Sequence, residues 1–447
     1  MASISYWFLS PSFFVALLGK LKGWDRTTPT PAFDWRKATL DLAIPAKNEA
    51  GNIALCLTSV FQQEFSPRKV TVIDDGSTDG TSDVVRQFCQ LTGHSVELIT
   101  REKSIGKTPS VREVSKASDA DALMVLDADT VLADRDYISR SVEELFKNAG
   151  VASVCGEVMP FTRRRRHQMA GSDAALRSIQ WRFGAGLVPS GGRWQALLEF
   201  FTVMYRTTLY TVLQRVVYEG HMKLFGSRLN PIGCAVTYKM ERLRECFAYA
   251  VPMMGDNLSN SEDIFIGHFF AWKGYRNVQV TGVKCESIEP TVVRLPKQLY
   301  LWSSAFLQSL HYFKELPLSP LKQVKAGLGN LFHARKPAKS PADHGRRIQE
   351  QYRAPWGEAH TRKFGRALGW ADLLLVFEKI TYPFILLYLA LFNHEAFWIT
   401  IGLEAVLSTA SVFVIADSGA RLKSAGMMLA ATPIRLLSLG VDLFVVG

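Results

Sequence analysis

Three long apolar stretches, at roughly residues 371–392, 396–416 and 424–446, follow one another in the last quarter of the chain. Each has about the ~20 residues that a helix needs to cross a ~30 Å hydrocarbon core. Because they are consecutive and joined by short connectors, they predict three transmembrane helices, within a region of 369–447. Charged residues inside the stretches leave buried helices of a soluble domain as the alternative; they are Glu378, Lys379, Glu404, Arg435 and Asp442.

Basic residues beside these stretches predict their orientation. Lys and Arg precede the first and third stretches, whereas the connector at 393–395 contains neither. Cytoplasmic connections carry an excess of Lys and Arg, so we expect the preceding domain to be cytoplasmic in a multi-pass protein of the cell (inner or plasma) membrane. The six cysteines are scattered without paired spacing, which agrees with a reducing compartment.

The first 25 residues contain another apolar segment, at 4–19, that is interrupted by Ser10-Pro11-Ser12. Its basic residues follow rather than precede it, which is the reverse of a cleavable signal peptide. Sixteen residues of helix cover only about 24 Å. Residues 1–25 are therefore expected to form either a short membrane anchor or a helix that lies in the interface.

From residue 40 onward, short apolar strands alternate with helical patterns. The expected strands are 40–45, 69–73, 95–99 and 122–126, and the expected helices are 53–60, 79–91 and 108–117. This alternation predicts an α/β domain over 36–310, with a mostly parallel sheet and flanking helices.

Polar clusters follow three of these strands, at 45–49, 74–77 and 127–129. Ligands of such sheets bind beyond the carboxyl ends of the strands, so the three clusters are expected to converge there. Carboxylates in this position suit a hard divalent cation that neutralises a diphosphate, which makes Asp129 the predicted ligand of Mg²⁺ or Mn²⁺. Asp127 would support the cation through water or reach a ribose.

Asp74 or Asp75 is expected to accept a hydrogen bond from a nucleobase or ribose. The alternative for Asp74 is a structural role, in which a strand-end aspartate caps the following helix.

Four segments together resemble the donor half of the inverting family 2 glycosyltransferases, to which cellulose, chitin and hyaluronan synthases belong. They are Ile44-Pro45-Ala46-Lys47-Asn48-Glu49, Asp74-Asp75-Gly76-Ser77, Gly106-Lys107 and Asp127-Ala128-Asp129. The similarity continues over roughly 40–302 through Gly233, Tyr238, Ser261-Glu262-Asp263, Gly274-Tyr275, Glu289-Pro290 and Gln298-Leu299-Tyr300-Leu301-Trp302. The resemblance implies a GT-A fold and a nucleoside-diphosphate sugar, with uridine as its base, as the donor.

The resemblance also implies a role for each matching residue. Asp263 would be the general base, with Glu262 as the alternative, because an inverting displacement needs one carboxylate to take the proton of the acceptor hydroxyl. Gln298, Trp302 and Gly233 would bind the acceptor, and Trp302 would offer its ring face to a sugar. The donor would bind to Pro45, Asn48, Glu49, Asp74, Asp75, Lys107 and Asp127.

Two positions depart from the family pattern: Arg112 stands where the family usually has an Asn after the Gly-Lys motif, and Leu301 stands where it usually has an Arg that helps to neutralise the diphosphate. Another cation would then be needed. The candidates are Lys107, Arg112, Arg294 and Lys297.

Basic segments account for much of the net charge of +11. Arginines 163–166 are expected to form a solvated loop near anionic lipid headgroups, and the apolar spacing over 196–219 predicts an amphipathic interfacial helix. Residues 311–368 are expected to form a basic linker or a gating region. No nucleic-acid-binding module accompanies these residues, so nucleic acid is not an expected partner.

Three functions remain open at this stage. The first is transfer of a sugar to a growing glycan in the bilayer, with or without coupled export. The second is addition of a single sugar to a lipid acceptor, as in ceramide glucosyltransferases. The third is a catalytically degenerate partner in a membrane assembly. The donor sugar, the acceptor and the oligomeric state do not follow from the sequence.

Overall fold

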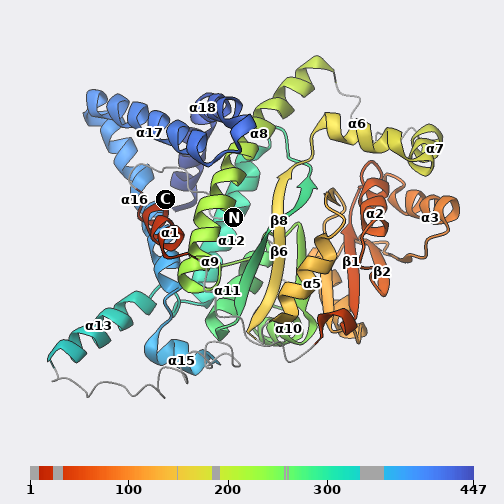
Figure 1. Ribbon diagram of the computed structural model, residues 1–447, viewed down its shortest axis with the longest axis horizontal. Coiled ribbons are helices and arrows are strands. Elements are labelled where there is room, and N and C mark those ends of the chain that lie inside the picture. Colours follow the sequence, from red (N-terminus) through yellow and green to blue (C-terminus); the bar gives the residue numbers. More distant parts are fainter. Residues whose placement is uncertain are drawn as a thin grey trace.

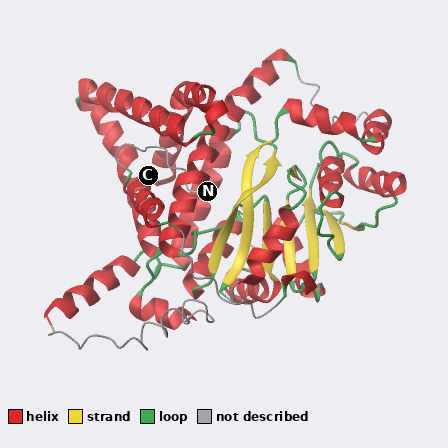
Figure 2. Ribbon diagram, viewed as in Figure 1, coloured by secondary structure: helices red, strands yellow, loops and turns green. Residues whose placement is uncertain are grey.

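The computed structural model describes residues 10–23, 34–147, 150–183, 192–255, 258, 261–332 and 357–446. A mixed sheet with flanking helices occupies one side of the molecule, and a group of long helices occupies the other (Figure 1). Figure 2 shows that the strands gather in the sheet and that the region at the C-terminal end is helical. The first and last described helices, α1 (Pro11–Lys22) and α18 (Arg421–Val446), both lie on the helical side.

The sheet has the strand order β3-β2-β1-β4-β7-β6-β8-β5 in the described part of the chain. The strands are β1 (Leu40–Ala46), β2 (Lys69–Asp74), β3 (Glu97–Thr100), β4 (Ala122–Leu126), β5 (Thr130–Leu132), β6 (Val151–Pro160), β7 (Ala235–Lys239) and β8 (Arg276–Ser287). β1 to β4 are mutually parallel, as predicted, and the four predicted strands are confirmed. The second half is mixed, because β7 runs antiparallel to both β4 and β6.

The direction of β7 matters for the site. It pairs Ala235 with Leu126, so the residues that enter β7 lie beside the residues that leave β4. A parallel strand would place its far end there instead. β1 and β4 are buried almost continuously, which is typical of central strands that are covered on both faces.

Helices follow the strands in the order that the sequence predicts. α5 packs on β6 and β8, and α4 packs on β1 and on α10. The helices that flank the sheet are η1 (Trp35–Lys37), α2 (Ile53–Phe61), α3 (Thr81–Thr92), α4 (Lys107–Ala117), α5 (Tyr137–Lys147), α10 (Met240–Met254) and α11 (Glu262–Lys273). α11 is buried on nearly all sides, which fixes its first turn firmly against the sheet.

The three C-terminal apolar stretches are helices, as predicted. They are α16 (Gly369–Phe392), α17 (His394–Ile415) and α18 (Arg421–Val446), with the short η3 (Ser418–Ala420) between the last two. Each is long and apolar enough to cross a membrane. Large apolar side chains remain exposed on them, among them Phe384, Tyr388, Trp398, Val414 and Phe444. A continuous surface of this kind suits contact with lipid, so these are three candidate membrane-spanning helices.

The charged residues inside these helices have partners. Lys379 Nζ lies 2.7 Å from Asp442 Oδ1, and Ser303 of α12 (Leu295–Tyr312) donates to the same oxygen. Arg435 pairs with Glu404 of the neighbouring helix. Pairing across helices is how apolar segments accommodate ionised groups, so these charges agree with membrane-spanning helices.

The N-terminal segment is described from Ser10 onward. α1 (Pro11–Lys22) is a twelve-residue helix, which covers about 18 Å. It crosses α9 (Glu219–Phe225) so closely that a Cβ on Gly19 would meet the carbonyl oxygen of Gly220 at 1.9 Å. Ser10 Oγ and Ser12 N both donate to Glu378 of α16. Residues 1–9 lie outside the described residues, and the choice between anchor and interfacial helix stays a prediction.

The segment between β6 and β7 is helical. It contains α6 (Arg163–Ser172), α7 (Ala174–Phe183), α8 (Arg193–Val212), the π-helical η2 (Leu213–Tyr218) and α9. The predicted helix at 196–219 is confirmed. The expectation of a loop at 163–166 is wrong, because the side chain of Thr162 accepts from Arg165 N and caps α6, and the arginines form its first turn.

The region 311–368 contains α13 (Ser319–Phe332) and α15 (Gly357–Phe364). α15 packs on α11, where Thr361 Oγ1 donates to the carbonyl oxygen of Trp272 at 2.7 Å. The rest of the predicted linker or gating region, 333–356, lies outside the described residues.

Candidate active site

The two aspartates after β4 form a tight turn at the edge of the sheet. Thr130 N donates to the carbonyl oxygen of Asp127 at 3.0 Å, and Asp127 N donates to that of Cys234 at 2.8 Å. The second bond ties the turn to the residues that enter β7. The antiparallel β7 therefore brings Gly233 and Cys234 next to Asp127.

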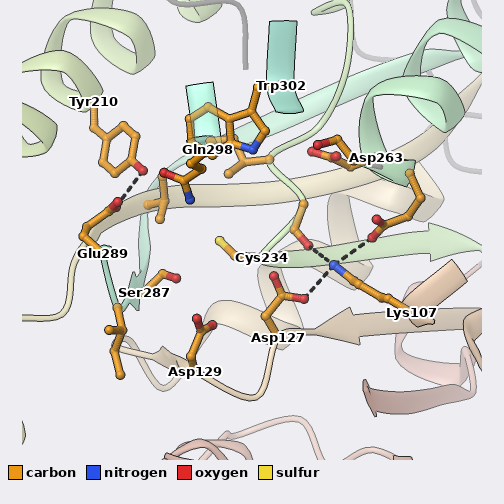
Figure 3. A pocket seen from close by; sticks show the side chains of 16 residues that line it. Lys107, Asp127, Asp129, Tyr210, Cys234, Asp263, Ser287, Glu289, Gln298 and Trp302 are labelled. Atoms are coloured by element: carbon orange, nitrogen blue, oxygen red, sulfur yellow. Dashed lines mark hydrogen bonds and ion pairs between the residues drawn. The ribbon is translucent and has the colours of Figure 1, made fainter. Parts of the chain in front are cut away.

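A cavity of about 250 Å³ opens at this edge (Figure 3). Asp127 and Asp129 reach into it from the turn after β4, while Asp263, Gln298 and Trp302 lie on its other side. Eight predicted site residues line the cavity: Lys107, Asp127, Asp129, Gly233, Glu262, Asp263, Gln298 and Trp302.

Lys107, at the first position of α4, joins two of the acidic elements. Its Nζ lies 2.6 Å from Asp127 Oδ1 and 2.7 Å from Glu262 Oε1. Burial alone would lower the pKa of Lys107, but the two carboxylates outweigh it and raise the pKa well above its ordinary value. Lys107 is thus a fixed cation in the cavity wall, and the carboxylate of Glu262 is engaged in an ion pair with it.

Asp127 and Asp129 both lie in buried surroundings that disfavour the charged form of a carboxylate. Burial raises the pKa of each to about 7; Lys107 opposes the shift at Asp127, and the charge of Glu49 adds to it at Asp129. Two such groups on one turn favour a cation between them, so the residues fit a divalent metal ion. Within the described residues no cluster of three or more His, Cys, Asp or Glu could hold one by itself. The remaining ligands would be water and phosphate oxygens.

Asp263 stands at the start of α11, opposite these aspartates. Burial, followed by the charge of Glu262, raises the pKa of its carboxyl group. Ser261, the residue that precedes the helix, has a φ of 50°, which is rare for a residue with a side chain. The backbone is held there in a costly conformation that aims the first turn of α11 into the cavity.

Gly233 makes room for Asp263. A Cβ on Gly233 would lie 2.7 Å from Asp263 Cγ and 2.8 Å from its Oδ2. We therefore assign Gly233 a steric role beside the carboxylate rather than a direct contact through a side chain.

Replacing Gly233 by Ala is expected to displace Asp263 and to slow turnover by about 10²-fold, because misplacement of a catalytic group by about 1 Å costs that much. Gly171→Ala is the matched control, since nothing lies within 4 Å of a Cβ there. Initial rates and circular dichroism of both variants test this. A Gly233→Ala protein as active as the Gly171→Ala protein would refute the steric role.

Gln298 and Trp302 lie one turn apart on α12, and both contact an arginine that is not among the predicted site residues. Arg206 of α8 is fully buried, donates from Nη2 to Gln298 Oε1, and places its guanidinium carbon 4.6 Å from the centre of the Trp302 ring. Glu289 completes the group, since its Oε2 lies 3.3 Å from Arg206 Nε. The Tyr210 hydroxyl donates to Glu289 Oε1 at 2.7 Å.

Arg206 contacts Gln298 and Trp302 of this motif, although it is not itself one of the residues that line the cavity. Lys107 does line the cavity, but Arg112, Arg294 and Lys297 are not among its lining residues. The signal for Arg206 was weak: it lies four residues before Tyr210 on a helix whose other buried residues are apolar, aromatic or threonine.

Three donor-side residues predicted from the first motif are not among the residues that line the cavity: Pro45, Asn48 and Glu49. Asn48 has a φ of 58°, and its Oδ1 accepts from Thr78 N at 2.9 Å, so it ties the loop after β1 to the loop after β2. Glu49 Oε2 accepts from Asn52 at 2.6 Å, and burial raises its pKa.

Asp74 and Asp75 also lie outside this lining. Asp74 accepts from Ser77 N and from the Ser82 hydroxyl in the first turn of α3, which gives it structural partners, but it does not cap that helix, whose N-cap is Gly80. Asp75 accepts from Ser104, Ile105 N, Gly106 N and Arg101. Burial would raise the pKa of Asp75, but these four donors hold it below its ordinary value. A nucleoside that binds Asp75 has to replace one of them.

Residues 41–203 match the family model described as Glycosyl transferase family 2. This segment holds β1 to β4 and the Asp127-Ala128-Asp129 turn. It is a family 2 glycosyltransferase domain. The GT-A-like mixed sheet with flanking helices is thereby confirmed, and so is the family resemblance.

Curated relatives match part of this chain rather than the whole of it. The poly-beta-1,6-N-acetyl-D-glucosamine synthase of Staphylococcus epidermidis is 25% identical over 151 residues, which are 34% of this chain and 35% of the relative. The dolichyl-phosphate beta-glucosyltransferase of Homo sapiens is 28% identical over 135 residues, 28% of this chain and 41% of that protein. The chain spans about a third of the length of the first curated relatives it matches.

Among solved structures, the chain was matched to a mannosyltransferase from Pyrobaculum calidifontis in complex with GDP-Man and Mn²⁺. The TM-score is 0.47 at 16% identity, and the match covers 95% of each chain.

Proposed function

We propose that this protein transfers a sugar from a nucleoside-diphosphate sugar, with uridine as the base, to a hydroxyl group of a glycan or lipid acceptor, with inversion. One observation carries the proposal: a cavity about 250 Å³ in volume joins the Asp127 and Asp129 pair to the carboxylate of Asp263. A cation-binding pair on one side and a base on the other are the two parts that an inverting displacement needs.

The reaction follows from this placement. Asp263 takes the proton of the acceptor hydroxyl as that oxygen bonds to the anomeric carbon, and the bond from this carbon to the diphosphate oxygen breaks. Attack from the face opposite the leaving group inverts the anomeric centre. The raised pKa of Asp263 suits a base, because a stronger conjugate base takes a proton more readily.

Asp129 and Asp127 would hold Mg²⁺ or Mn²⁺, which when bound neutralises the departing diphosphate. Lys107, already paired with Asp127, adds a positive charge at the cavity wall. Arg206 fixes Gln298 and the ring of Trp302, and the ring offers an apolar face to a sugar.

The membrane arrangement is part of the proposal. α16, α17 and α18 span the bilayer, and the catalytic domain lies in the cytoplasm, where nucleotide sugars are available. The basic residues next to α16 and α18 support this orientation.

Product analysis tests the proposed reaction. Purified full-length protein in detergent, supplied with an α-linked donor, is expected to form a β-linked product, read from the anomeric proton coupling in its NMR spectrum. A ladder of products would indicate a growing glycan, and a single added sugar would indicate a lipid acceptor. Retention of the α configuration would contradict the single displacement on which the role of Asp263 rests.

A further inference from the structure

A second cavity, of about 300 Å³, lies between the first turn of α6 and the helix α8. Ile288 and Glu289 line both this cavity and the catalytic one, so the two share a wall. Ile288 also connects them through the backbone, since its N–H donates to the carbonyl oxygen of Asp129 at 3.2 Å. A molecule in the second cavity is therefore a neighbour of the reacting groups.

The basic side of this cavity is only partly neutralised. Arg163, Arg164 and Arg166 line it, opposed by Glu199 and Glu289. Glu199 accepts from Arg163 Nη2 at 2.9 Å, and Glu289 is engaged by Arg206 and Tyr210 in the active-site group described above.

Two arginines therefore remain for an incoming anion. Arg164 is exposed, and Arg166 is 7% exposed. Arg166 Nη2 donates to Asn52 Oδ1 at 2.8 Å, but its Nε finds no hydrogen-bond partner among the described residues. A buried guanidinium N–H without a partner is costly, and a phosphate oxygen is the acceptor that suits it best.

The other side of the cavity is apolar and leads toward the candidate membrane helices. Phe161, Phe200 and Val203 line it. Phe200 of α8 is 58% exposed, and Met204 and Val212, further along this helix, belong to one buried apolar cluster with Val412 of α17 and Met428 of α18. α8 packs against α17 and α18, and Figure 1 shows it passing from those helices toward α6.

We propose that this second cavity binds the phosphate of a lipid-linked acceptor. The phosphate lies on Arg164 and Arg166, the apolar chain follows α8 toward the bilayer, and the hydroxyl that receives the sugar enters the catalytic cavity beyond Glu289. This inference rests on the proposed glycosyl transfer and narrows its acceptor to a phosphate-bearing lipid with a free hydroxyl.

Equilibrium binding by the purified full chain in detergent tests the proposal without any turnover. The probe is farnesyl phosphate, compared with farnesol and with inorganic phosphate. Farnesyl phosphate is expected to bind at least roughly tenfold more tightly than either, since the site takes both parts of the molecule. Equal binding of farnesol would overturn the anionic site, and equal binding of inorganic phosphate would show a free-anion site instead.

Neighbouring residues supply matched variants. Arg164→Glu should weaken farnesyl phosphate binding by roughly tenfold or more, whereas Arg165→Glu should stay within about twofold, because Arg165 pairs with Glu286 outside the cavity lining. Phe200→Ala should weaken binding too, but Phe201→Ala should not, since Phe201 is absent from the lining. Equal losses within each pair would indicate diffuse contact with a membrane surface and overturn the site.

Failure here is distinguishable from failure of the proposed reaction. Release of nucleotide from the donor depends on Asp129 and Asp263 and is measured separately. If the protein turns over the donor but does not bind farnesyl phosphate preferentially, the proposed function is supported and only the proposed acceptor is contradicted.

Discussion

Replacing Asp263 by Asn is expected to lower the rate of sugar transfer by about 10² to 10⁴-fold, the contribution typical of a general base. The amide has nearly the same shape, so the packing against Gly233 should survive, but it does not accept the proton of the acceptor hydroxyl. Donor affinity should remain close to that of the parent, because the diphosphate side of the cavity is unchanged. Single-turnover rates and donor binding measured on the same preparation separate the two effects.

Glu262→Gln is the matched control for this substitution. Glu262 is the adjacent carboxylate and the alternative base, but it is already paired with Lys107 at 2.7 Å. Its loss should change donor binding through Lys107 more than the proton-transfer step. A larger loss of single-turnover rate in Glu262→Gln than in Asp263→Asn would reverse the assignment.

Asp129→Ala is expected to abolish the dependence of turnover on Mg²⁺ or Mn²⁺, together with most of the turnover itself. In the parent, a chelator should stop the reaction and added Mn²⁺ should restore it. Removing one of the two carboxylates leaves the cation with too few protein ligands to compete with water. Turnover by Asp129→Ala that still rises with added Mn²⁺ would place the cation elsewhere.

The pH dependence of cation binding gives a second readout for this pair. Without a cation, burial raises the pKa of Asp129 from an ordinary 3.8 to about 7, so the folded state binds more protons than the unfolded state between these values. Stability then falls as pH rises through this window. A bound cation displaces these protons and so removes the trend. The increase in Tm caused by Mn²⁺ should be larger at pH about 8 than at pH about 6, and Asp129→Ala should flatten this difference.

The predictable part of the site is the part that is local in sequence. Asp127 and Asp129 follow a buried strand, and strand ends in a parallel sheet meet at one edge, so their place at this edge followed from pattern alone, whereas Lys107 was placed there by the family resemblance. The start of α11 was recognisable from the family pattern, which placed Asp263 in the same cavity.

The parts that were not predictable depend on contacts between distant segments. The sequence does not say that β7 runs antiparallel, yet this direction is what brings Gly233 to Asp263. Arg206 was not predicted, because an arginine inside an amphipathic helix usually faces solvent. Its contacts with Gln298 and Trp302 of α12 are seen only in the folded structure.

The same limit applies to the charges in the apolar stretches. Lys379 and Asp442 are 63 positions apart, and either one alone argues against a membrane helix. In the folded structure the two residues form an ion pair, which removes this objection to a membrane helix. The hydropathy of the sequence does not reveal that pairing. The arginines of α6 are a similar case, because the cap at Thr162 turned an expected loop into helix.

Nucleotide release tests the central claim most directly. The purified full chain, in detergent with Mn²⁺, should be supplied in turn with a panel of nucleoside-diphosphate sugars, beside the Asp129→Ala and Asp263→Asn variants. The account predicts that the parent releases nucleotide from at least one uridine diphosphate sugar and that both variants lose nearly all of this activity. Equal release by all three proteins, or none by the parent from any donor, would contradict a catalytic site at Asp127, Asp129 and Asp263.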